Sequence, residues 1–404
     1  MRIKFPSSFL WGSAISSYQC EGGNSFCDWF EWEKKKNLQP CGLACNHYNL
    51  FKKDFSLARK LNLNSLRFSL EWSRLCPEPG VFLEKELNHY LEVLNELLLQ
   101  GLEPVVTLHH FTNPVWFAKM QSFSRAKNID HFLFYLGKVV RALKDKVNIW
   151  LIFNEPLVYI YNSYVEGIWP PGSKSLLSAK KVLDNIITAY CLGYEEINRI
   201  YKTEKSSPRI SLAKNMRVFS PCHEGAKNLN SFSAQLRSRV FNFWLIEKLT
   251  KAGKLDFLAL NYYCREFVRF KGPLGAACSH GYDSRKNYLG WDIYPQGFYE
   301  LLMRLKKYNL PVFVTENGSA ESQETFYESY LLEHLRSLAR AYEEGVDLMG
   351  YLWWSLLDNF EWDKGFGPRF GLIEVDYTNF NRKIKPFAYT YAKICKENEI
   401  DTKC

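Results

Sequence analysis

Eight short apolar segments, each followed by a stretch with helical periodicity, recur along the chain and restrict the folds open to it. Helical patterns such as KELNHYLEVLNELLLQG (85–101) carry apolar residues at i, i+3 and i+4 and end on a glycine. Strands that alternate with helices in this way predict a parallel sheet covered by helices. The strand segments are 9–16, 65–70, 103–110, 148–155, 209–216, 256–263, 311–318 and 350–357.

Eight strands are the number that closes a (β/α)8 barrel, and near-continuous apolar runs are typical of strands buried on both faces. The alternative is an open doubly wound sheet, which usually has a glycine-rich phosphate loop after its first strand. The segment GSAISSYQCEGG (12–23) lacks the GxGxxG spacing, and no Gly/Ser linker divides the 404 residues. We therefore predict an α/β fold, a single (β/α)8 TIM barrel that forms one domain over residues 1–404.

Composition argues against several other classes of protein. The net charge is +9, but the lysines form short scattered clusters without interleaved aromatic residues, so we expect no nucleic-acid partner. Nowhere do eighteen apolar residues run together, so we expect no membrane span and no membrane partner, and the N-terminal segment has no signal-peptide core. Eleven cysteines without a disulfide-like rhythm predict a reduced, cytoplasmic protein. Cys41 and Cys45 lack the further ligands of a zinc site, so we expect no metal.

Polar residues gather where the predicted strands end. Two glutamates stand out, because Glu155 closes IWLIFNEP (149–156) and Glu316 lies in PVFVTENGSA (311–320), each directly after an apolar run. The reactive groups of a (β/α)8 barrel lie at the carboxyl ends of its strands, so these side chains should converge on one mouth. Reading the strand ends in order gives Gln19, Arg67, His110, Asn154, Glu155, Asn215, Tyr263, Glu316, Trp354 and Glu361.

Two carboxylates facing each other across a cleft suit hydrolysis of a glycosidic bond. One acid protonates the departing oxygen, while the other attacks the anomeric carbon or activates water. These roles require opposite protonation states, so the two environments must differ. The alternative explanation is that each glutamate only caps a helix N-terminus, where acids are favoured.

Longer motifs carry a resemblance to a known family. FNEP (153–156) and VTENG (314–318) resemble the two signatures of family 1 glycoside hydrolases, which are retaining β-glycosidases on a (β/α)8 barrel. The resemblance covers nearly the whole chain and occurs in the expected order. The other matching segments are FPSSFLWGSAISSYQCEGG, LRFSLEWSRL, TLHHFTNPVW, GIWPPG, LNYY, GWDIYPQG, GYLWWSLLDNFEW and GFGPRFGLIEVDY.

The resemblance implies roles for individual residues. Glu316 matches the nucleophile and Glu155 the general acid/base, with Arg67, Asn154 and Tyr263 in support; retention requires carboxyl groups about 5–5.5 Å apart. We expect Arg67 and Tyr263 to hold Glu316 ionised. We further expect Trp354 to lie under the sugar and Trp353, its neighbour on the strand, to face the core. The remaining substrate-binding positions are Gln19, His110, Glu361, Trp362 and Phe370 around the glycone and Asn215 and Trp291 towards the aglycone.

Glu361 also bears on the substrate. It stands where phospho-β-glycosidases that resemble this family have a small residue, and its carboxylate would repel a phosphate dianion. The sequence thus predicts a cofactor-free exo-β-glycosidase for an unphosphorylated gluco-, galacto- or fuco-configured sugar, presented as a small β-glycoside or short oligosaccharide. A transglycosidase that uses the same intermediate and a non-catalytic sugar-binding barrel are the alternatives. The oligomeric state stays open.

Overall fold

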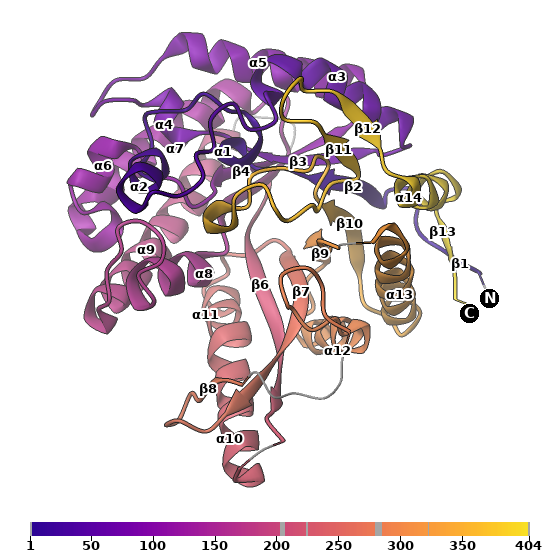
Figure 1. The fold of residues 1–404 in the computed structure, drawn as a ribbon. Helices are drawn as coiled ribbons and strands as arrows, with labels where there is room; N and C mark the ends of the chain where they lie inside the picture. The colour runs from indigo at the N-terminus through magenta and orange to yellow at the C-terminus, as the bar shows by residue number, and fades with distance from the viewer. Residues whose placement is uncertain (1, 203–206, 224, 279–284, 322, 403–404) are drawn as a thin grey trace.

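The computed structural model describes residues 2–202, 207–223, 225–278, 285–321 and 323–402. Eight parallel strands form a closed barrel with helices around it, as the sequence predicts (Figure 1). Pairing runs in the order β6-β5-β4-β3-β2-β10-β9-β7, and an additional β6–β7 pairing closes the ring. The barrel strands are β2 (Leu10–Ala14), β3 (Ser65–Ser69), β4 (Glu103–His109), β5 (Ile149–Asn154), β6 (Arg209–Pro221), β7 (Leu258–Arg269), β9 (Val312–Asn317) and β10 (Leu348–Trp354).

Alternate strand residues fill the barrel interior, because successive side chains on a strand point to opposite faces. The interior cluster contains apolar side chains from six of the strands or the residues that lead into them: Val105, Ile149, Leu151, Ala213, Phe257, Ala259, Phe313 and Leu352. The outward-facing residues pack against the helices and form the much larger outer core. The barrel is therefore a solid support, and space for a ligand is confined to its ends.

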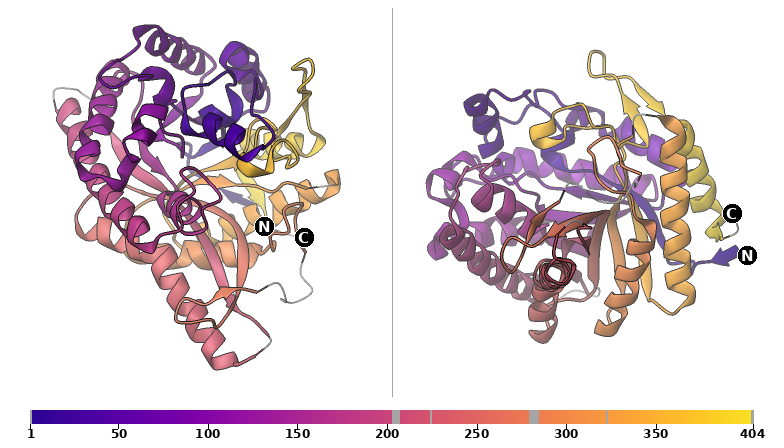
Figure 2. Two further views of the ribbon diagram at one scale, coloured as in Figure 1. Left: turned by 60° about the vertical axis from the view of Figure 1, so that its left-hand side comes forward. Right: turned by 60° about the horizontal axis from the view of Figure 1, so that its bottom comes forward.

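Helices surround the strands, and the two further views in Figure 2 show this ring from other sides. The predicted helix at 85–101 is α5 (Glu84–Leu99). The other helices are α1 (Ser17–Cys20), α2 (Asp28–Lys36), α3 (His47–Lys60), α4 (Trp72–Leu75), α6 (Val115–Lys119), α7 (Ile129–Leu143), α8 (Pro156–Ile160), α9 (Leu176–Tyr201), α10 (Lys227–Ser238), α11 (Trp244–Lys251), α12 (Pro295–Leu305), α13 (Glu324–Glu343) and α14 (Pro386–Glu397).

Small strand pairs complete the fold outside the barrel. The chain begins at β1 (Arg2–Lys4), which pairs antiparallel with β13 (Glu399–Asp401), so the two ends of the chain lie together (Figure 1). A second antiparallel pair joins β11 (Ile373–Val375) to β12 (Arg382–Ile384).

Strands β6 and β7 are longer than the sequence predicts. Each continues about five residues past its expected end, and the two strands stay paired from Val218 opposite Arg265 to Pro221 opposite Val268. Helix α10 packs on both extensions, and the short strand β8 (Ala276–Ala277) pairs with the end of β7. We call residues 217–251 and 264–278, where described, the β6–β7 arm; its strand ends and α10 extend away from the barrel at the lower edge of Figure 1.

The arm also corrects one prediction from the sequence. Cys222 and Cys278 form a disulfide, so the expectation of a fully reduced chain is wrong for this pair. The two residues are 56 positions apart, so no local cysteine pattern indicated the bond. Across the described ranges, no helix is long and apolar enough to cross a membrane.

Candidate active site

Glu155 and Glu316 lie at the same end of the barrel. Strand β5 ends at Asn154, and Glu155 follows in a left-handed conformation with φ of 42°, directly before Pro156 opens α8. Such a backbone is uncommon for a residue other than glycine and is often found at functional sites. Glu316 is the penultimate residue of β9, where it pairs in register with Asn261 of β7. Both carboxylates are buried.

A continuous hydrogen-bond network joins the two glutamates. Arg67 Nη1 donates to Glu316 Oε1 over 2.5 Å, and its Nη2 donates to Asn154 Oδ1 over 2.6 Å. The Asn261 amide donates to the same Asn154 oxygen at 3.2 Å and to Glu155 Oε1 at 2.8 Å. Three intervening side chains therefore hold Glu155 and Glu316 in one polar cluster, as the sequence predicts for their shared mouth.

The second oxygen of Glu316 has its own partner, since the Tyr263 hydroxyl donates to Oε2. The pKa of Glu316 is raised to about 7: burial is the largest cause, Arg67 opposes it, the Glu155 carboxylate adds to it, and the Tyr263 hydrogen bond opposes it. The prediction that Arg67 and Tyr263 would leave Glu316 with its charged form favoured is thus only partly right. Both partners act in the expected direction, but desolvation outweighs them.

Asn261 is a site residue that the sequence analysis missed. It lies within LNYY, where attention fell on Tyr263 two positions later. Thr315 Oγ1 donates to Asn261 Oδ1 over 2.7 Å, which turns the amide nitrogen towards Glu155. Asn215, expected on the aglycone side, also donates to Glu155 Oε1, over 3.0 Å. A polar residue in an otherwise apolar strand was the available signal for Asn261.

Gln19 and Glu361 meet directly. Gln19 Nε2 donates to Glu361 Oε2 at 3.1 Å and to the Phe360 backbone carbonyl at 2.8 Å. Ser16 Oγ donates to the side-chain oxygen of Gln19, Oε1, at 2.7 Å. Helix α1, which follows β2, therefore presents the Gln19 side-chain amide to the loop after β10. The structure brings these two predicted ligands together although 342 positions separate them in the chain.

Aromatic rings lie beside this polar pair. The His110 ring is nearly parallel to those of Trp354 and Trp362, with interplanar angles of 14° and centroid distances of 6.0 and 6.2 Å. His110 Nε2 also lies 3.2 Å from the Asn154 amide nitrogen. Burial lowers the pKa of His110 well below its usual value, and Arg67 adds to this effect. His110 is accordingly a neutral imidazole that links the aromatic group to the carboxylate network.

The two tryptophans at the end of β10 face opposite sides, as predicted. Trp353 packs outward against Tyr330 and Phe387, and its indole donates to the Phe370 carbonyl over 2.8 Å. Trp354 faces inward in an apolar cluster with Phe370. Tyr263 and Trp291 border the same cluster, with Tyr263 5.6 Å from the Trp291 ring and 6.2 Å from Phe370. All the predicted site residues therefore lie around one mouth.

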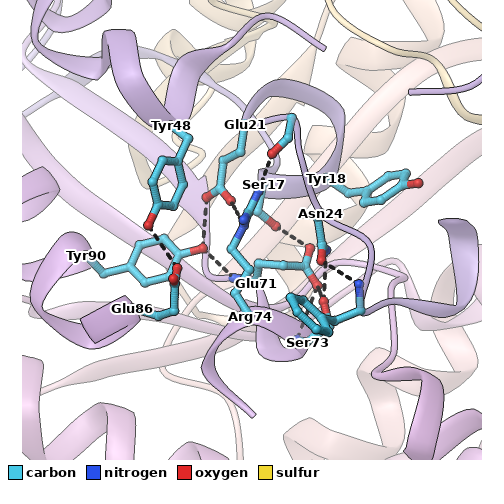
Figure 3. Close-up of polar contacts among 12 residues, drawn as sticks. Ser17, Tyr18, Glu21, Asn24, Tyr48, Glu71, Ser73, Arg74, Glu86 and Tyr90 are labelled. Atoms are coloured by element: carbon cyan, nitrogen blue, oxygen red, sulfur yellow. Dashed lines mark hydrogen bonds and ion pairs between the residues drawn. The ribbon is translucent and has the colours of Figure 1, made fainter. Parts of the chain in front are cut away.

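A buried glutamate that the sequence analysis did not single out anchors two of the site's loops. Glu71 accepts hydrogen bonds from Ser17 at 3.0 Å, from the Ser73 hydroxyl at 2.7 Å and from Thr112 at 3.1 Å (Figure 3). Ser17 belongs to α1, two residues before Gln19, and Thr112 follows His110 by two residues. Glu71 thus fixes the segments that carry two predicted sugar ligands.

A neighbouring ion pair fixes the far side of the same segment. Arg74 donates to Glu21 Oε2 over 2.8 Å, and the Tyr90 hydroxyl donates to Glu21 Oε1 over 2.9 Å, as Figure 3 shows. Both charged groups are largely buried, so their pairing offsets the desolvation cost of each. The α1 segment is held from two sides.

No group of three or more His, Cys, Asp and Glu side chains suited to a metal ion occurs among the residues placed by the structure. The side chains gathered at the mouth offer carboxylates, amides, a guanidinium, an imidazole, a phenol and aromatic faces. Closely spaced carboxylates within a barrel mouth are the arrangement that glycosidic bond hydrolysis requires.

Comparison with known proteins agrees with this class. The barrel and its mouth are those of a glycoside hydrolase. The model of glycosyl hydrolase family 1 matches residues 1–254 and 233–400, so the chain belongs to this family.

Similar proteins cover almost the whole chain. Beta-glucosidase A of Thermotoga maritima is 30% identical over 98% of this chain and 99% of its own length. A beta-glycosidase structure from Pyrococcus horikoshii superposes with a TM-score of 0.92 at 36% identity, covering 99% of this chain and 97% of the other. A Thermotoga maritima beta-glucosidase in complex with glucoimidazole gives a TM-score of 0.90 at 29% identity, covering 98% and 99%.

Glu361 provides a test of the site's electrostatics. The pKa of Glu361 is raised to about 8, mainly by burial and then by the Glu316 and Asp363 carboxylates, while the Gln19 hydrogen bond opposes the rise. An acid whose pKa is raised on folding is neutral in the folded protein over a range in which the unfolded chain has already ionised. Stability is therefore lost as pH rises from about 4.5 through about 8.

We expect Glu361→Gln to remove this loss, because the amide cannot ionise. The melting temperature of the variant should equal that of the wild type at about pH 4 and exceed it at about pH 9. Thermal unfolding across this pH range measures the difference. The exposed Glu92 on α5 supplies the control, and Glu92→Gln should leave the pH profile unchanged. A Glu361→Gln profile parallel to that of the wild type would contradict the assignment.

Proposed function

We propose that the protein is a retaining exo-β-glycosidase that removes terminal, non-reducing, unphosphorylated β-D-glucosyl residues, with tolerance for β-galactosyl and β-fucosyl groups. The observation that carries the proposal is the network from Glu316 through Arg67, Asn154 and Asn261 to Glu155. It gives each glutamate different hydrogen-bond partners: Glu316 accepts from a cation, whereas Glu155 accepts from two neutral amides and has the cations Lys214 and Arg217 nearby. Opposite protonation states are what the two roles require.

In the first step, a Glu316 oxygen attacks the anomeric carbon as the bond from that carbon to the aglycone oxygen breaks. Glu155 donates its proton to the departing oxygen, so the aglycone leaves as a neutral alcohol. Arg67 and Tyr263 each bind one Glu316 oxygen, which fixes the plane of the carboxylate before attack. The product of this step is a glycosyl ester on Glu316 and an ionised Glu155.

Glu155 is oriented for this proton transfer. Asn215 and Asn261 both donate to Oε1, at 3.0 and 2.8 Å. Within the part of the chain that the structure places, Oε2 accepts no hydrogen bond from protein. We infer that Oε2 carries the proton. In the second step the same oxygen takes a proton from water, the water oxygen bonds to the anomeric carbon, and the ester to Glu316 breaks with overall retention.

The remaining side chains are assigned to the sugar. Gln19, His110, Asn154, Glu361 and Trp362 offer donors and acceptors to a ring whose hydroxyls do both. Asn154 is assigned to the 2-hydroxyl, whose hydrogen bond strengthens towards the transition state. Trp354 provides the stacking face. Asn215 and Trp291 are assigned to the aglycone side, and Phe370 closes the glycone pocket beside Trp354.

A transglycosidase would use the same first step and resolve the ester with an alcohol. A non-catalytic sugar-binding barrel is less compatible with the site, because ligand binding alone does not require two buried glutamates in one network. A cytoplasmic location stays a prediction from the cysteine pattern, and the Cys222–Cys278 disulfide argues against it.

Removing either glutamate should separate the two roles. We expect Glu316→Ala and Glu155→Ala each to lower turnover of an aryl β-glucoside by at least about 100-fold while the fold persists. Azide should rescue Glu316→Ala with an inverted glycosyl azide and Glu155→Ala with a retained one. NMR of the products distinguishes them. Glu92→Ala on α5 is the control and should keep wild-type turnover, whereas the opposite azide pattern would reverse the two assignments.

Glu361 should exclude phosphorylated sugars. We expect kcat/KM for an aryl β-glucoside to exceed that for its 6-phosphate by at least about 100-fold, because a phosphate dianion would be buried beside an acid side chain, at a cost that a hydroxyl does not have. Glu361→Ser should narrow this ratio, and Glu374→Ser on β11, which removes an exposed acid, should not. A wild type that prefers the 6-phosphate would overturn the substrate assignment.

A further inference from the structure

The β6–β7 arm concentrates the positive charge of the protein. Residues 217–275 contain ten Lys or Arg and four Asp or Glu, which gives this segment +6 of the chain's net charge of +9. Four of these cations pair with acids: Arg217 and Arg237 with Glu266, Lys254 with Glu195, and Arg265 with Asp292, while Glu247 pairs with Lys307. The exposed side chains of the arm include Lys227, Arg239, Lys248, Lys251 and Lys271. The excess charge comes from arginines and from a shortage of acids, whereas the lysines are as scattered as the sequence indicated.

The same arm exposes an apolar stripe. Four side chains along α10, the π-helical turn after it and α11 are between 38% and 53% exposed: Leu229, Phe232, Val240 and Trp244. Their spacing, with the partly buried Leu236 between them, is three or four residues, which places side chains along one side of a helix. The opposite side packs on the barrel through Leu245, Ile246 and Leu249. This helical segment therefore has two apolar faces, one buried against the barrel and one exposed to solvent.

A turn of the arm carries two further exposed apolar side chains. Phe270 and Leu274, between β7 and β8, are 38% and 47% exposed. The turn is held to α10, because Phe270 N donates to Asn230 Oδ1 over 2.8 Å and Ser233 Oγ donates to the Gly272 carbonyl over 3.3 Å. We call Leu229, Phe232, Val240, Trp244, Phe270 and Leu274 the arm face. Grouped apolar side chains of this kind usually mark an interaction surface.

The chemistry of the arm face selects its partner. A symmetric dimer through this face would bring two copies of the same basic segment together, since an isologous interface pairs a patch with itself. Repulsion between like charges opposes that arrangement. Large apolar side chains bordered by lysine and arginine are instead the composition of helices that lie on anionic lipid surfaces. We propose that the arm face docks on the surface of an anionic lipid bilayer.

The arm begins at the barrel mouth. Strands β6 and β7 pass Asn215 and Tyr263 of the candidate active site and continue into the arm. In Figure 2 the arm extends well away from the barrel. The arrangement favours β-glucosides with a lipid aglycone, a consequence that rests on the proposed function, whereas docking itself does not. Docking of this kind needs no membrane span, but it departs from the sequence prediction of no membrane partner.

Vesicle co-sedimentation of the full chain tests the docking. Wild-type protein should sediment with vesicles of phosphatidylcholine containing about one-third phosphatidylglycerol, much less with pure phosphatidylcholine, and less as salt rises. Leu229→Gln with Phe232→Gln should lower the bound fraction at least about fivefold. The matched control is Leu98→Gln with Leu99→Gln, which changes two exposed leucines on α5 and should bind like the wild type. Lys227→Glu with Lys271→Glu, compared with Lys52→Glu and Lys53→Glu on α3, tests the charge separately.

Each variant is also assayed on a soluble aryl β-glucoside, where we expect wild-type rates because none of these residues lies in the candidate active site. Arm-face variants that keep wild-type rates but lose vesicle binding would support the proposal. A wild type that docks but has no glycosidase activity would refute only the proposed function. Three outcomes overturn the docking: a wild type that does not bind the anionic vesicles, arm-face variants that bind them equally, or a wild-type dimer that the arm-face variants dissociate. If the glutamine variants misfold, vesicle binding by the Lys227→Glu, Lys271→Glu variant decides whether the docking proposal holds.

Discussion

The Arg67 guanidinium is the group on which the geometry of the mouth depends. It is almost fully buried, in the middle of β3, and it donates to Glu316, to Asn154 and to the Thr107 hydroxyl. A buried cation is stable only if carboxylates and hydrogen-bond acceptors surround it, so Arg67 requires these neighbours as much as they require it. Because the three partners come from β9, β5 and β4, their mutual distances are set by the closed ring of strands.

This dependence explains why the two glutamates differ. Glu316 receives a cation and a phenol, while Glu155 receives two amides on one oxygen. Burial raises the pKa of Glu316 despite its cation, so the ionised form is only narrowly accessible near neutrality. A nucleophile whose anion is weakly stabilised forms its ester more readily than one whose anion is strongly stabilised by its surroundings. The same side chains that fix the structure thus set the reactivity of the site.

Much of the fold and site follows from local sequence. The eight apolar runs predict the barrel strands, and their polar ends predict Glu155, Glu316 and the residues around them. Four features escaped because they depend on contacts distant in sequence. Asn261 becomes a site residue through Thr315, Glu71 through Ser17 and Thr112, and the β6–β7 extension through pairing of two strands with each other. The Cys222–Cys278 bond belongs to the same group. The net direction of the Glu316 pKa shift was misjudged because burial cannot be weighed against a cation before both are placed.

Covalent trapping tests the central claim most directly. A 2-deoxy-2-fluoro β-glucoside with a good leaving group slows both steps, and the leaving group lets the first step proceed, so a glycosyl-enzyme accumulates. Mass spectrometry of the digested protein should find one fluoroglucosyl group, on the peptide that contains Glu316, with the label lost on prolonged incubation. A label on Glu155, or hydrolysis of the natural-configured glycoside with inversion and no adduct, would contradict the account.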